Sequence, residues 1–292
     1  LAELGTVYRA ERSGTLHGLL KPRGFTQDDA HIICTKQQML DELVKVVDFI
    51  FYLYKIFGFD DFHIELSTRP KKSVGSDEIW EKATSALKKA LETKKINYKL
   101  NPGDGAFYGP KIDFHVKDAI GRTWQCGTIQ LDFNLPERFK MEYIDEKGKK
   151  QRPVMIHRTI LGSIERFIGI LLEHFAGALP LWLSPVQAEI INVGAAHRNY
   201  ADLINQQLTT NDIRANLSDE NLTVSKRIRE AEIQKIPYIL VVGDKEVQNK
   251  TVNVRHRNKK EGLSAEAKAK VEEIKIEELI EKIKREIEDK II

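Results

Sequence analysis

Cysteine is scarce in this sequence: Cys34 and Cys126 are the only two among 292 residues. Two cysteines cannot form the disulfide network that stabilises a small secreted domain, so the composition indicates a reducing compartment, most simply the cytoplasm. Long apolar runs are also missing, and none approaches the about 20 residues of a membrane-spanning helix. The first residues are mixed and charged, unlike a secretory signal peptide, so we expect a cytoplasmic protein with no membrane partner.

A strong charge of one sign is missing as well. Lys and Arg number 46 against 43 Asp and Glu, for a net charge of +3, which is too small to indicate nucleic-acid binding by itself. Hydrophobic residues make up 41% of the chain and charged residues 30%, as in ordinary globular proteins. The length suffices for two domains with large cores.

The first part of the chain has strand patterns joined by hairpins, together with long helices. The expected strands are residues 6–11, 23–34, 62–68, 104–118, 123–133 and 153–159. The expected helices are residues 36–57, 76–95 and 162–179. This arrangement predicts an antiparallel α+β domain.

The second part alternates strands with helices. Pro180 and Pro185 interrupt the earlier pattern, and we place a domain boundary between residues 182 and 183. Beyond it, expected strands are residues 188–193, 213–219, 238–246 and 251–257, and expected helices are residues 199–211 and 225–235. This predicts a smaller α/β domain with a mostly parallel sheet. A terminal amphipathic helix is expected over residues 271–292, with one apolar stripe: Ile276, Leu279, Ile280, Ile283 and Ile287.

The strand expected at residues 23–34 has an unusual face. Every second position carries a side chain of different chemistry, and all would point to one side: Arg23, Phe25, Gln27, Asp29 and His31. Alternating polar residues usually mark the solvent face of an antiparallel sheet, but such faces are commonly Lys, Glu and Thr. The alternative is the floor of a polar pocket, where several groups converge on one small molecule.

Three further charged residues fit such a pocket. Arg9 and Glu11 lie two apart on the preceding strand, and a hairpin would bring them to the same surface. Arg166 lies in a strongly apolar helix, where a guanidinium needs an anion, either the neighbouring Glu165 or a ligand phosphate. Several arginines around one pocket suit a triphosphate, and Glu11 could accept a hydrogen bond from an exocyclic amine.

Seven segments in this order resemble the threonyl-tRNA synthetase family of class II aminoacyl-tRNA synthetases. They are SGTLHGLL, RGFTQDDAHIIC, STRPKKSVGSDEIW, GAFYGPKIDF, QCGTIQLDF, VMIHRTILGSIERF and IPYILVVGDKE. The resemblance implies a class II antiparallel-sheet catalytic domain over residues 1–182, incomplete at its start, and an anticodon-binding domain over residues 183–292. It also implies ATP-dependent activation of threonine and its transfer to tRNA(Thr).

The resemblance further implies roles for individual residues. For ATP, accompanied by Mg²⁺, these are Arg9, Glu11, Arg23, Gln125 and Arg166. For threonine they are Gln27, Asp29, Tyr108 and Gln130. The residues implied in catalysis are Arg9, Lys111, Gln125 and Arg166, and those implied in anticodon binding are Asn221, Glu246 and Arg255.

His31 and His157 match two ligands of the zinc ion in this family. A zinc with an open position can bind the hydroxyl of threonine, which the near-isosteric valine lacks. A catalytic zinc needs three protein ligands. Cys34 has the parity of the opposite strand face, and burial explains Cys126 more simply. The third ligand in the family is a cysteine upstream of residue 1, so we expect this chain to be a fragment of a homodimeric enzyme.

Two departures from the family pattern, one parity conflict and one rival function remain. Ser225 stands where the family commonly has a glycine. Lys21-Pro22-Arg23 stands where the family usually has Arg-Val-Arg. Gln125 and Gln130 have opposite parity, so aiming both at one pocket requires a bulge near Gly127. The rival is a catalytically inactive, synthetase-like module that binds RNA or a regulatory partner; truncation favours it and the intact charged residues disfavour it. The pair of histidines argues against a prolyl enzyme, and no DNA partner is expected.

Overall fold

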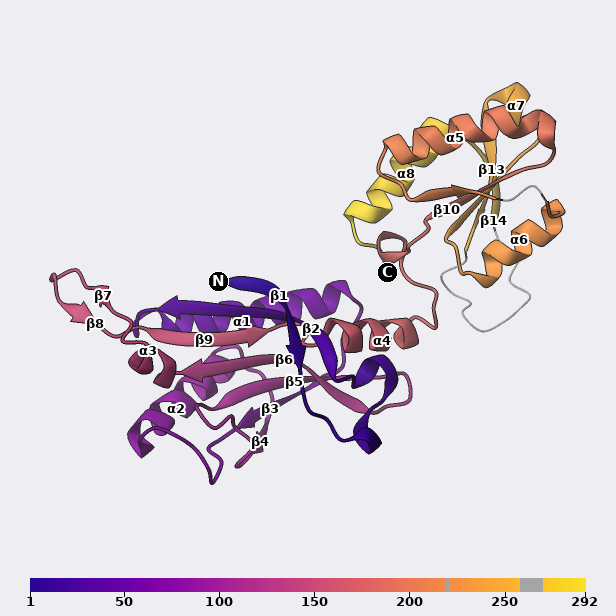
Figure 1. The fold of residues 1–292 in the computed structure, drawn as a ribbon. Helices are drawn as coiled ribbons and strands as arrows, with labels where there is room; N and C mark the ends of the chain where they lie inside the picture. The colour runs from indigo at the N-terminus through magenta and orange to yellow at the C-terminus, as the bar shows by residue number, and fades with distance from the viewer. Residues whose placement is uncertain (219–220, 258–269) are drawn as a thin grey trace. The chain divides into compact units, whose positions relative to one another are not determined.

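The computed structural model describes residues 1–218, 221–257 and 270–292. It divides into two compact units, Leu1–Glu173 and His174–Ile292, each with its own sheet (Figure 1). This division falls before the boundary expected between residues 182 and 183, which stays a prediction. None of the helices in the described ranges combines the length and apolar character needed to cross a membrane.

The first unit is built on a seven-stranded sheet. Its strand order is β1-β2-β9-β6-β5-β3-β4, and all neighbours are antiparallel except β3 and β4. The strands are β1 (Ala2–Tyr8), β2 (Gly24–Cys34), β3 (Phe62–Ser67), β4 (Lys99–Asn101), β5 (Lys111–Lys117), β6 (Thr123–Asp132) and β9 (Val154–Thr159). A short hairpin of β7 (Tyr143–Ile144) and β8 (Lys150–Gln151) projects from the unit. The expected antiparallel α+β architecture is confirmed.

Helices cover one face of this sheet. Helix α1 (Met39–Ile56) packs on β2, β6 and β9, and α2 (Asp77–Thr93) packs on β5 and β6. Alternate strand residues fill the layer beneath them: Ile64, Leu66, Ile112, Phe114, Ile129, Leu131 and Ile156. The intervening positions are largely polar, and they place the candidate site on the opposite face. The unit also contains α3 (Asn134–Arg138) and ends in α4 (Ile164–His174).

Two expected strands differ from the observed ones. Strand β1 ends at Tyr8, so Arg9 and Glu11 follow it, although the Arg9 N–H still donates to the Arg23 carbonyl at 2.8 Å. Strand β5 begins at Lys111 instead of residue 104. The preceding loop is pressed against backbone, because a Cβ on Gly109 would lie 2.2 Å from the Leu131 carbonyl oxygen.

The bulge expected near Gly127 is present. Asp113 pairs with Thr128 and His115 with Gln125, so two residues of β6 stand opposite one residue of β5. The Gly127 N–H donates to the Tyr54 hydroxyl at 2.9 Å, and that hydroxyl donates to the Ile160 carbonyl at 3.0 Å. A Cβ on Gly127 would approach the same hydroxyl to 2.9 Å, so the close contact favours glycine.

The second unit has a five-stranded sheet of order β11-β10-β12-β13-β14. Its strands are β10 (Ala188–Asn192), β11 (Ala215–Leu217), β12 (Tyr238–Val242), β13 (Thr251–His256) and β14 (Lys270–Lys275). Its helices are α5 (Arg198–Thr210), α6 (Val224–Ile233), α7 (Asp244–Asn249) and α8 (Ile276–Glu288). The strand expected over residues 238–246 ends at Val242, because α7 begins at Asp244. The expectation of a mostly parallel sheet is wrong: β13 runs antiparallel to both of its neighbours, β12 and β14, so half of the strand pairings are antiparallel and the sheet is mixed.

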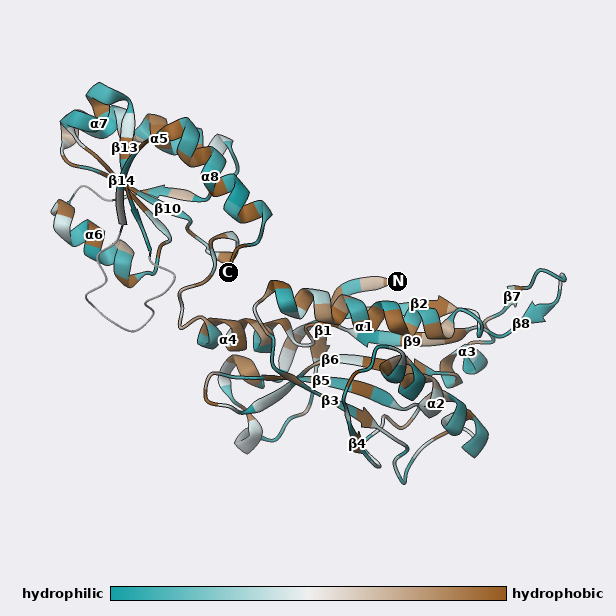
Figure 2. Cartoon of the chain, turned by 180° about the vertical axis from the view of Figure 1, so that it is seen from behind, coloured by the Kyte–Doolittle hydropathy of each residue, from teal (hydrophilic) through white to brown (hydrophobic). Residues whose placement is uncertain are grey.

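The terminal helix starts later than expected. Residues 270–275 form a strand paired with β13, and α8 begins only at Ile276. The apolar stripe is nevertheless placed as expected, since Ile276, Leu279, Ile280 and Ile283 are buried in the core of the unit and Ile287 packs against it. Figure 2 shows hydrophobic and hydrophilic residues alternating along α5 and α8.

Candidate active site

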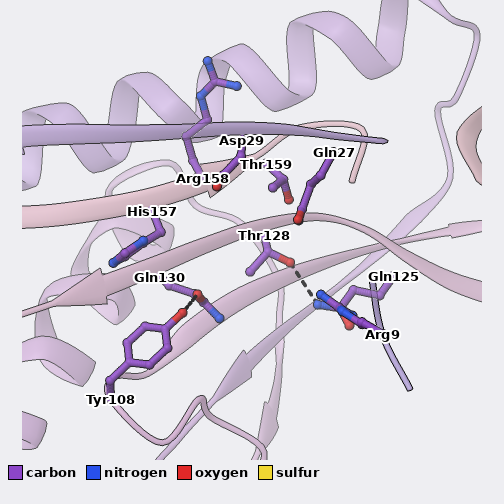
Figure 3. A pocket seen from close by; sticks show the side chains of 10 residues that line it. All are labelled: Arg9, Gln27, Asp29, Tyr108, Gln125, Thr128, Gln130, His157, Arg158 and Thr159. Carbon is purple, nitrogen blue, oxygen red and sulfur yellow. Dashed lines mark hydrogen bonds between the residues drawn. The ribbon is translucent and has the colours of Figure 1, made fainter. Parts of the chain in front are cut away.

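The open face of the first sheet carries a cavity of about 260 Å³, which we call the polar cavity (Figure 3). Its lining residues come from three strands, β2, β6 and β9, and from two loops. They are Arg9, Gln27, Asp29, Tyr108, Gln125, Thr128, Gln130, His157, Arg158 and Thr159. The strand register brings them together, because β2, β9, β6 and β5 are consecutive in the sheet. Sequence reasoning found seven of these residues and missed Thr128, Arg158 and Thr159.

A second cavity of about 100 Å³, here the arginine cavity, adjoins the first. The two share Arg9, Gln27, Gln125, Thr128 and Thr159. The arginine cavity adds eight residues, of which two are cationic and one is acidic. They are Glu11, Lys21, Pro22, Phe25, Cys126, Gly162, Ser163 and Arg166. Together the cavities form a continuous polar site with two arginines at one end.

Local contacts hold the charged residues of the arginine cavity. The guanidinium carbon of Arg9 lies 5.1 Å from the centroid of the Phe25 ring. Lys21 Nζ lies 3.5 Å from Glu11 Oε2, so the residue that departs from the family pattern pairs with a predicted ATP residue. Their charges offset each other, which leaves Arg9 and Arg166 as the cations available for an anion.

Arg166 is held by carbonyls and not by Glu165. Its Nε donates to the Leu20 carbonyl and its Nη1 to the Gln125 carbonyl, both at 2.7 Å. Glu165 instead accepts from the Thr26 N–H at 2.9 Å and the Ser163 hydroxyl at 3.1 Å. Burial lowers the pKa of Arg166, but a guanidinium stays protonated in proteins. The half-buried cation therefore suits a ligand phosphate.

Tyr108 and the two glutamines form hydrogen bonds across the polar cavity. The Tyr108 hydroxyl donates to Gln130 Oε1, and Gln125 Nε2 donates to Thr128 Oγ1 at 2.9 Å (dashed in Figure 3). Burial, with the nearby Asp132 and Asp29 charges, raises the pKa of Tyr108 to about 12. The phenol is therefore protonated at neutral pH and acts as a donor.

Three predicted site residues of the first unit do not line either cavity: Arg23, Lys111 and His31. The Arg23 guanidinium donates from Nε to the Glu11 carbonyl at 3.1 Å and from Nη2 to the Ser13 hydroxyl at 3.3 Å. Arg23 thus ties down the loop that carries Glu11. Lys111 stands opposite Gln130 in the pairing of β5 with β6, and its Nζ lies 2.7 Å from Asp113.

His31 and His157 lie together, as expected. They are directly paired across β2 and β9, and their ring centroids are 4.6 Å apart, edge to face. His157 Nε2 lies 3.1 Å from Asp132 Oδ2. With Nε2 facing the Asp132 carboxylate, Nδ1 is the ring nitrogen left for a metal or another ligand.

The zinc site is incomplete in the part of the chain that the structure describes. Within it, no group of three or more His, Cys, Asp or Glu side chains is placed to hold a metal ion. Both cysteines are free and buried, and burial raises the pKa of Cys34 to about 11 and that of Cys126 to about 12. The two histidines thus fit as two zinc ligands and lack a third.

Three buried or half-buried carboxylates support the site, and sequence reasoning missed all of them. Asp28 accepts from the N–H groups of Ile160 and Gly162 at 2.8 and 2.9 Å, which fixes the turn before α4. Asp132 orients His157 and caps α3 through the Asn134 N–H. The third, Asp113, contacts two predicted catalytic residues. The sequence does contain a signal for them. Each is an aspartate within a strand, or at its end, that is expected to be partly buried, and a buried carboxylate needs polar partners.

The predicted anticodon residues occupy three different elements of the second unit. Asn221 precedes α6, Glu246 lies in α7 and Arg255 lies in β13 opposite Ile239. Glu246 Oε2 accepts from the Gly243 N–H at 2.9 Å at the start of its helix. The neighbouring Arg227 is buried and donates to the Ser218 hydroxyl at 3.1 Å, so it stabilises the unit and is not part of a solvated helix face.

Comparison with known proteins shows the class. Residues 1–175 match the tRNA synthetase class II core domain (G, H, P, S and T), and residues 187–286 match the anticodon binding domain. The chain therefore belongs to the class II tRNA synthetase family.

Within this class the chain is similar to threonine–tRNA ligases. It is 59% identical to that of Carboxydothermus hydrogenoformans over 257 residues, which cover 88% of this chain and 40% of the relative. The ligase of Sulfurihydrogenibium sp. is 56% identical over 290 residues, covering 99% of this chain and 44% of the relative. The chain thus spans less than half the length of the curated relatives it matches.

A solved structure described as the RNA binding domain of threonyl-tRNA synthetase from Cryptosporidium parvum Iowa II superposes with a TM-score of 0.90 at 42% identity. It covers 97% of this chain and 69% of that chain. A prolyl-tRNA synthetase from Cryptosporidium parvum has a TM-score of 0.67 at 17% identity, which shows the shared fold alone.

Proposed function

We propose that the chain is the later catalytic core and the anticodon-binding domain of a threonine–tRNA ligase. The observation that carries this proposal is the continuous site, with two arginines at one end and a polar amino-acid-sized cavity at the other. The identity of the amino acid comes from the relatives, which are threonine–tRNA ligases.

In this proposal ATP takes the arginine cavity. Arg9 and Arg166 bind its phosphates, Glu11 accepts from the adenine amine, and Gln125 lies where the two cavities meet. Mg²⁺ accompanies the nucleotide. Such chemistry needs mainly positioning and charge neutralisation, which preorganised arginines supply. Arg23 contributes by holding the loop of Glu11.

Threonine takes the polar cavity. Asp29 pairs with its ammonium group, while Gln27, Tyr108 and Gln130 hold its backbone. The threonine carboxylate attacks the α-phosphorus of ATP; a carboxyl–phosphate bond forms and the bond to the leaving pyrophosphate breaks. A hydroxyl of the terminal adenosine of tRNA(Thr) then attacks the carbonyl carbon, and AMP leaves. Lys111 and Gln125 stabilise charge at the first step.

Zinc fits this site only in part. His31 and His157 would hold it together with a third ligand from outside the described residues. When bound, the ion offers an open Lewis-acid position to the hydroxyl that distinguishes threonine from valine. Asp132 keeps His157 in one orientation for this role.

The second unit reads the anticodon in this proposal. Asn221, Glu246 and Arg255 have side chains suited to the edges of unpaired bases. The complete enzyme is proposed to be a cytoplasmic homodimer.

A second candidate is a catalytically inactive synthetase-like module that binds RNA or a regulatory partner. The match of residues 187–286 to the anticodon binding domain supports RNA binding, which this candidate shares with the first one. Threonine-dependent ATP–pyrophosphate exchange, measured on this chain and on the full-length gene product, separates the two. We expect exchange by the full-length product with threonine and not with valine. Binding of tRNA(Thr) without any exchange would support the inactive module instead.

A further inference from the structure

We infer that Asp113 is a positioning residue that sets the places of Lys111 and Gln125 for threonine activation. The inference rests on the proposed function, because that function gives both residues their catalytic role. Asp113 lines neither cavity, so it acts through its two partners. Gln125 lines both cavities, and Lys111 stands opposite Gln130, which lines the polar cavity.

Each oxygen of the Asp113 carboxylate holds one of the two residues. Oδ2 lies 2.7 Å from Lys111 Nζ, and Oδ1 accepts from Gln125 Nε2 at 2.6 Å. Two hydroxyls complete the shell: Ser67 donates to Oδ2 at 3.2 Å and Thr128 to Oδ1 at 3.1 Å. The carboxylate thus links one residue of β5 with another of β6.

Burial makes these contacts obligatory. Asp113 is 1% exposed, and an ionised carboxylate so far from water is costly unless charged and polar donors surround it. Conversely, Lys111 and Gln125 have long side chains that lose rotamer freedom when they are held. One buried anion therefore fixes two flexible side chains at once.

The location of Asp113 explains why this contact matters for Gln125. The register between β5 and β6 shifts immediately after Asp113, at the bulge that turns Gln125 toward the cavities. An irregular strand segment defines side-chain direction less strictly than a regular one. The hydrogen bond to Asp113 supplies that direction for Gln125.

Asparagine at this position separates the two contacts. In Asp113→Asn the amide oxygen can still accept from Gln125 and Thr128, but the amide nitrogen cannot accept from Lys111. The variant keeps nearly the same volume, so it removes the shorter of the two carboxylate contacts of Lys111 with little change in packing. The other contact, to Asp104 Oδ2 at 3.4 Å, belongs to a side chain that is 60% exposed and holds the ammonium less tightly. Asp113→Glu keeps the charge but displaces it by one methylene group.

A labelling experiment on this chain tests the positioning without relying on activity. An amine-modifying reagent is applied, and the modification rate of each lysine is followed by mass spectrometry. We expect Lys111, whose side chain is 13% exposed, to react at least about tenfold faster in Asp113→Asn than in the wild type. The rate at the exposed Lys82 should not change. An unchanged rate at Lys111 overturns the inference.

Exchange kinetics of the full-length gene product test the consequence. We expect Asp113→Asn to lower kcat by about 100-fold, the scale of a misplacement near 1 Å, with KM for ATP nearly unchanged. The double variant with Lys111→Met should lose no more than Lys111→Met alone, because both changes remove one interaction. Asp145→Asn, a carboxylate that organises the distant β7–β8 hairpin, should leave exchange unchanged.

Other outcomes decide against the inference or against the function. Wild-type kcat in Asp113→Asn, or a loss that multiplies with that of Lys111→Met, overturns the positioning role. If Asp113→Asn does not fold, Asp113→Glu replaces it, with an expected loss of about tenfold in kcat, and wild-type kcat there overturns the inference too. Absence of exchange in the wild type contradicts the proposed function, while the labelling result still decides the role of Asp113.

Discussion

At the scale of single residues, the site depends on charged side chains that backbone groups hold in place. Arg166 is the clearest case, because two carbonyls hold its guanidinium and Glu165 is engaged elsewhere. Its charge therefore remains for a ligand. The sequence predicted this much, since an arginine among apolar helix residues demands an anion. It could not predict the carbonyl partners, which come from loops and strands far away along the chain.

Replacement of Arg166 by lysine should damage ATP activation. Lysine has one donor group and cannot reproduce the planar fork that contacts the Leu20 and Gln125 carbonyls while facing the cavity. We expect Arg166→Lys to lower kcat/KM of pyrophosphate exchange. The corresponding loss of transition-state stabilisation should be about 2.7–4 kcal/mol, the scale of one preorganised donor. Arg152→Lys, at an arginine that pairs with Glu137 outside both cavities, serves as the control. Unchanged exchange in Arg166→Lys would make Arg166 a structural residue.

Glu189 should make the stability of the second unit depend on pH. Burial in β10 raises its pKa to about 7, above the value of 4.5 expected in the unfolded chain. A raised carboxyl pKa contributes stability that is full below about pH 4.5 and is lost as pH rises through about 7. The free energy of unfolding of Glu189→Gln, measured by thermal unfolding at pH 8, should therefore exceed that of the wild type by about 1–3 kcal/mol, after allowance for solvent screening.

The same comparison at pH 4.5 provides the internal control, because there the wild-type carboxyl is protonated and the two proteins should unfold alike. Glu278→Gln, an exposed position on α8, should show no pH-dependent difference of this kind. Equal stability of Glu189→Gln and wild type at pH 8 would show that Glu189 is well solvated.

At the scale of elements, register decides which residues meet. Parity along β2 correctly brought Gln27 and Asp29 to one cavity, and His31 lies beside the cavity residue His157. The conflict between Gln125 and Gln130 correctly required a bulge. Parity could not find Asp113 or Asp132, because their partners depend on which strands are neighbours in the sheet. The end of β1 and the start of α8 were also missed, since a strand and a helix end can share one apolar pattern over a few residues.

Zinc binding tests the juxtaposition of β2 and β9 directly. Two imidazoles without a third protein ligand hold zinc weakly, so this chain should retain less than one zinc per molecule after dialysis, as measured by elemental analysis. His157→Ala should remove the remainder. The full-length gene product should retain one zinc per chain. Tight one-to-one binding by this chain alone would mean that Cys34, Cys126 or another group completes the site.

At the scale of the whole molecule, the sites proposed for activation and for tRNA recognition lie in separate units. The two cavities lie entirely within Leu1–Glu173, and the predicted anticodon residues lie within His174–Ile292. Damage to one function should therefore leave the other intact.

Arg255→Ala provides that test for the second unit. It should raise KM for tRNA(Thr) in aminoacylation, with a loss of about 1–3 kcal/mol in the free energy of tRNA binding, the value of one base-reading contact. Pyrophosphate exchange should stay unchanged. Arg229→Ala, at an exposed position on α6, tests whether loss of any nearby positive charge has the same effect. An equal loss of exchange activity in Arg255→Ala would show that Arg255 supports the fold and does not read the anticodon.

A crystal structure of the full-length gene product with a non-hydrolysable threonyl-adenylate analogue tests the central claim most directly. The account predicts that the analogue spans both cavities, with its phosphate-mimicking group beside Arg9 and Arg166 and its ammonium beside Asp29. The threonine hydroxyl should then face the pair formed by His31 and His157. An analogue bound elsewhere, or bound with its ammonium among the arginines, would contradict the assignment of the two cavities.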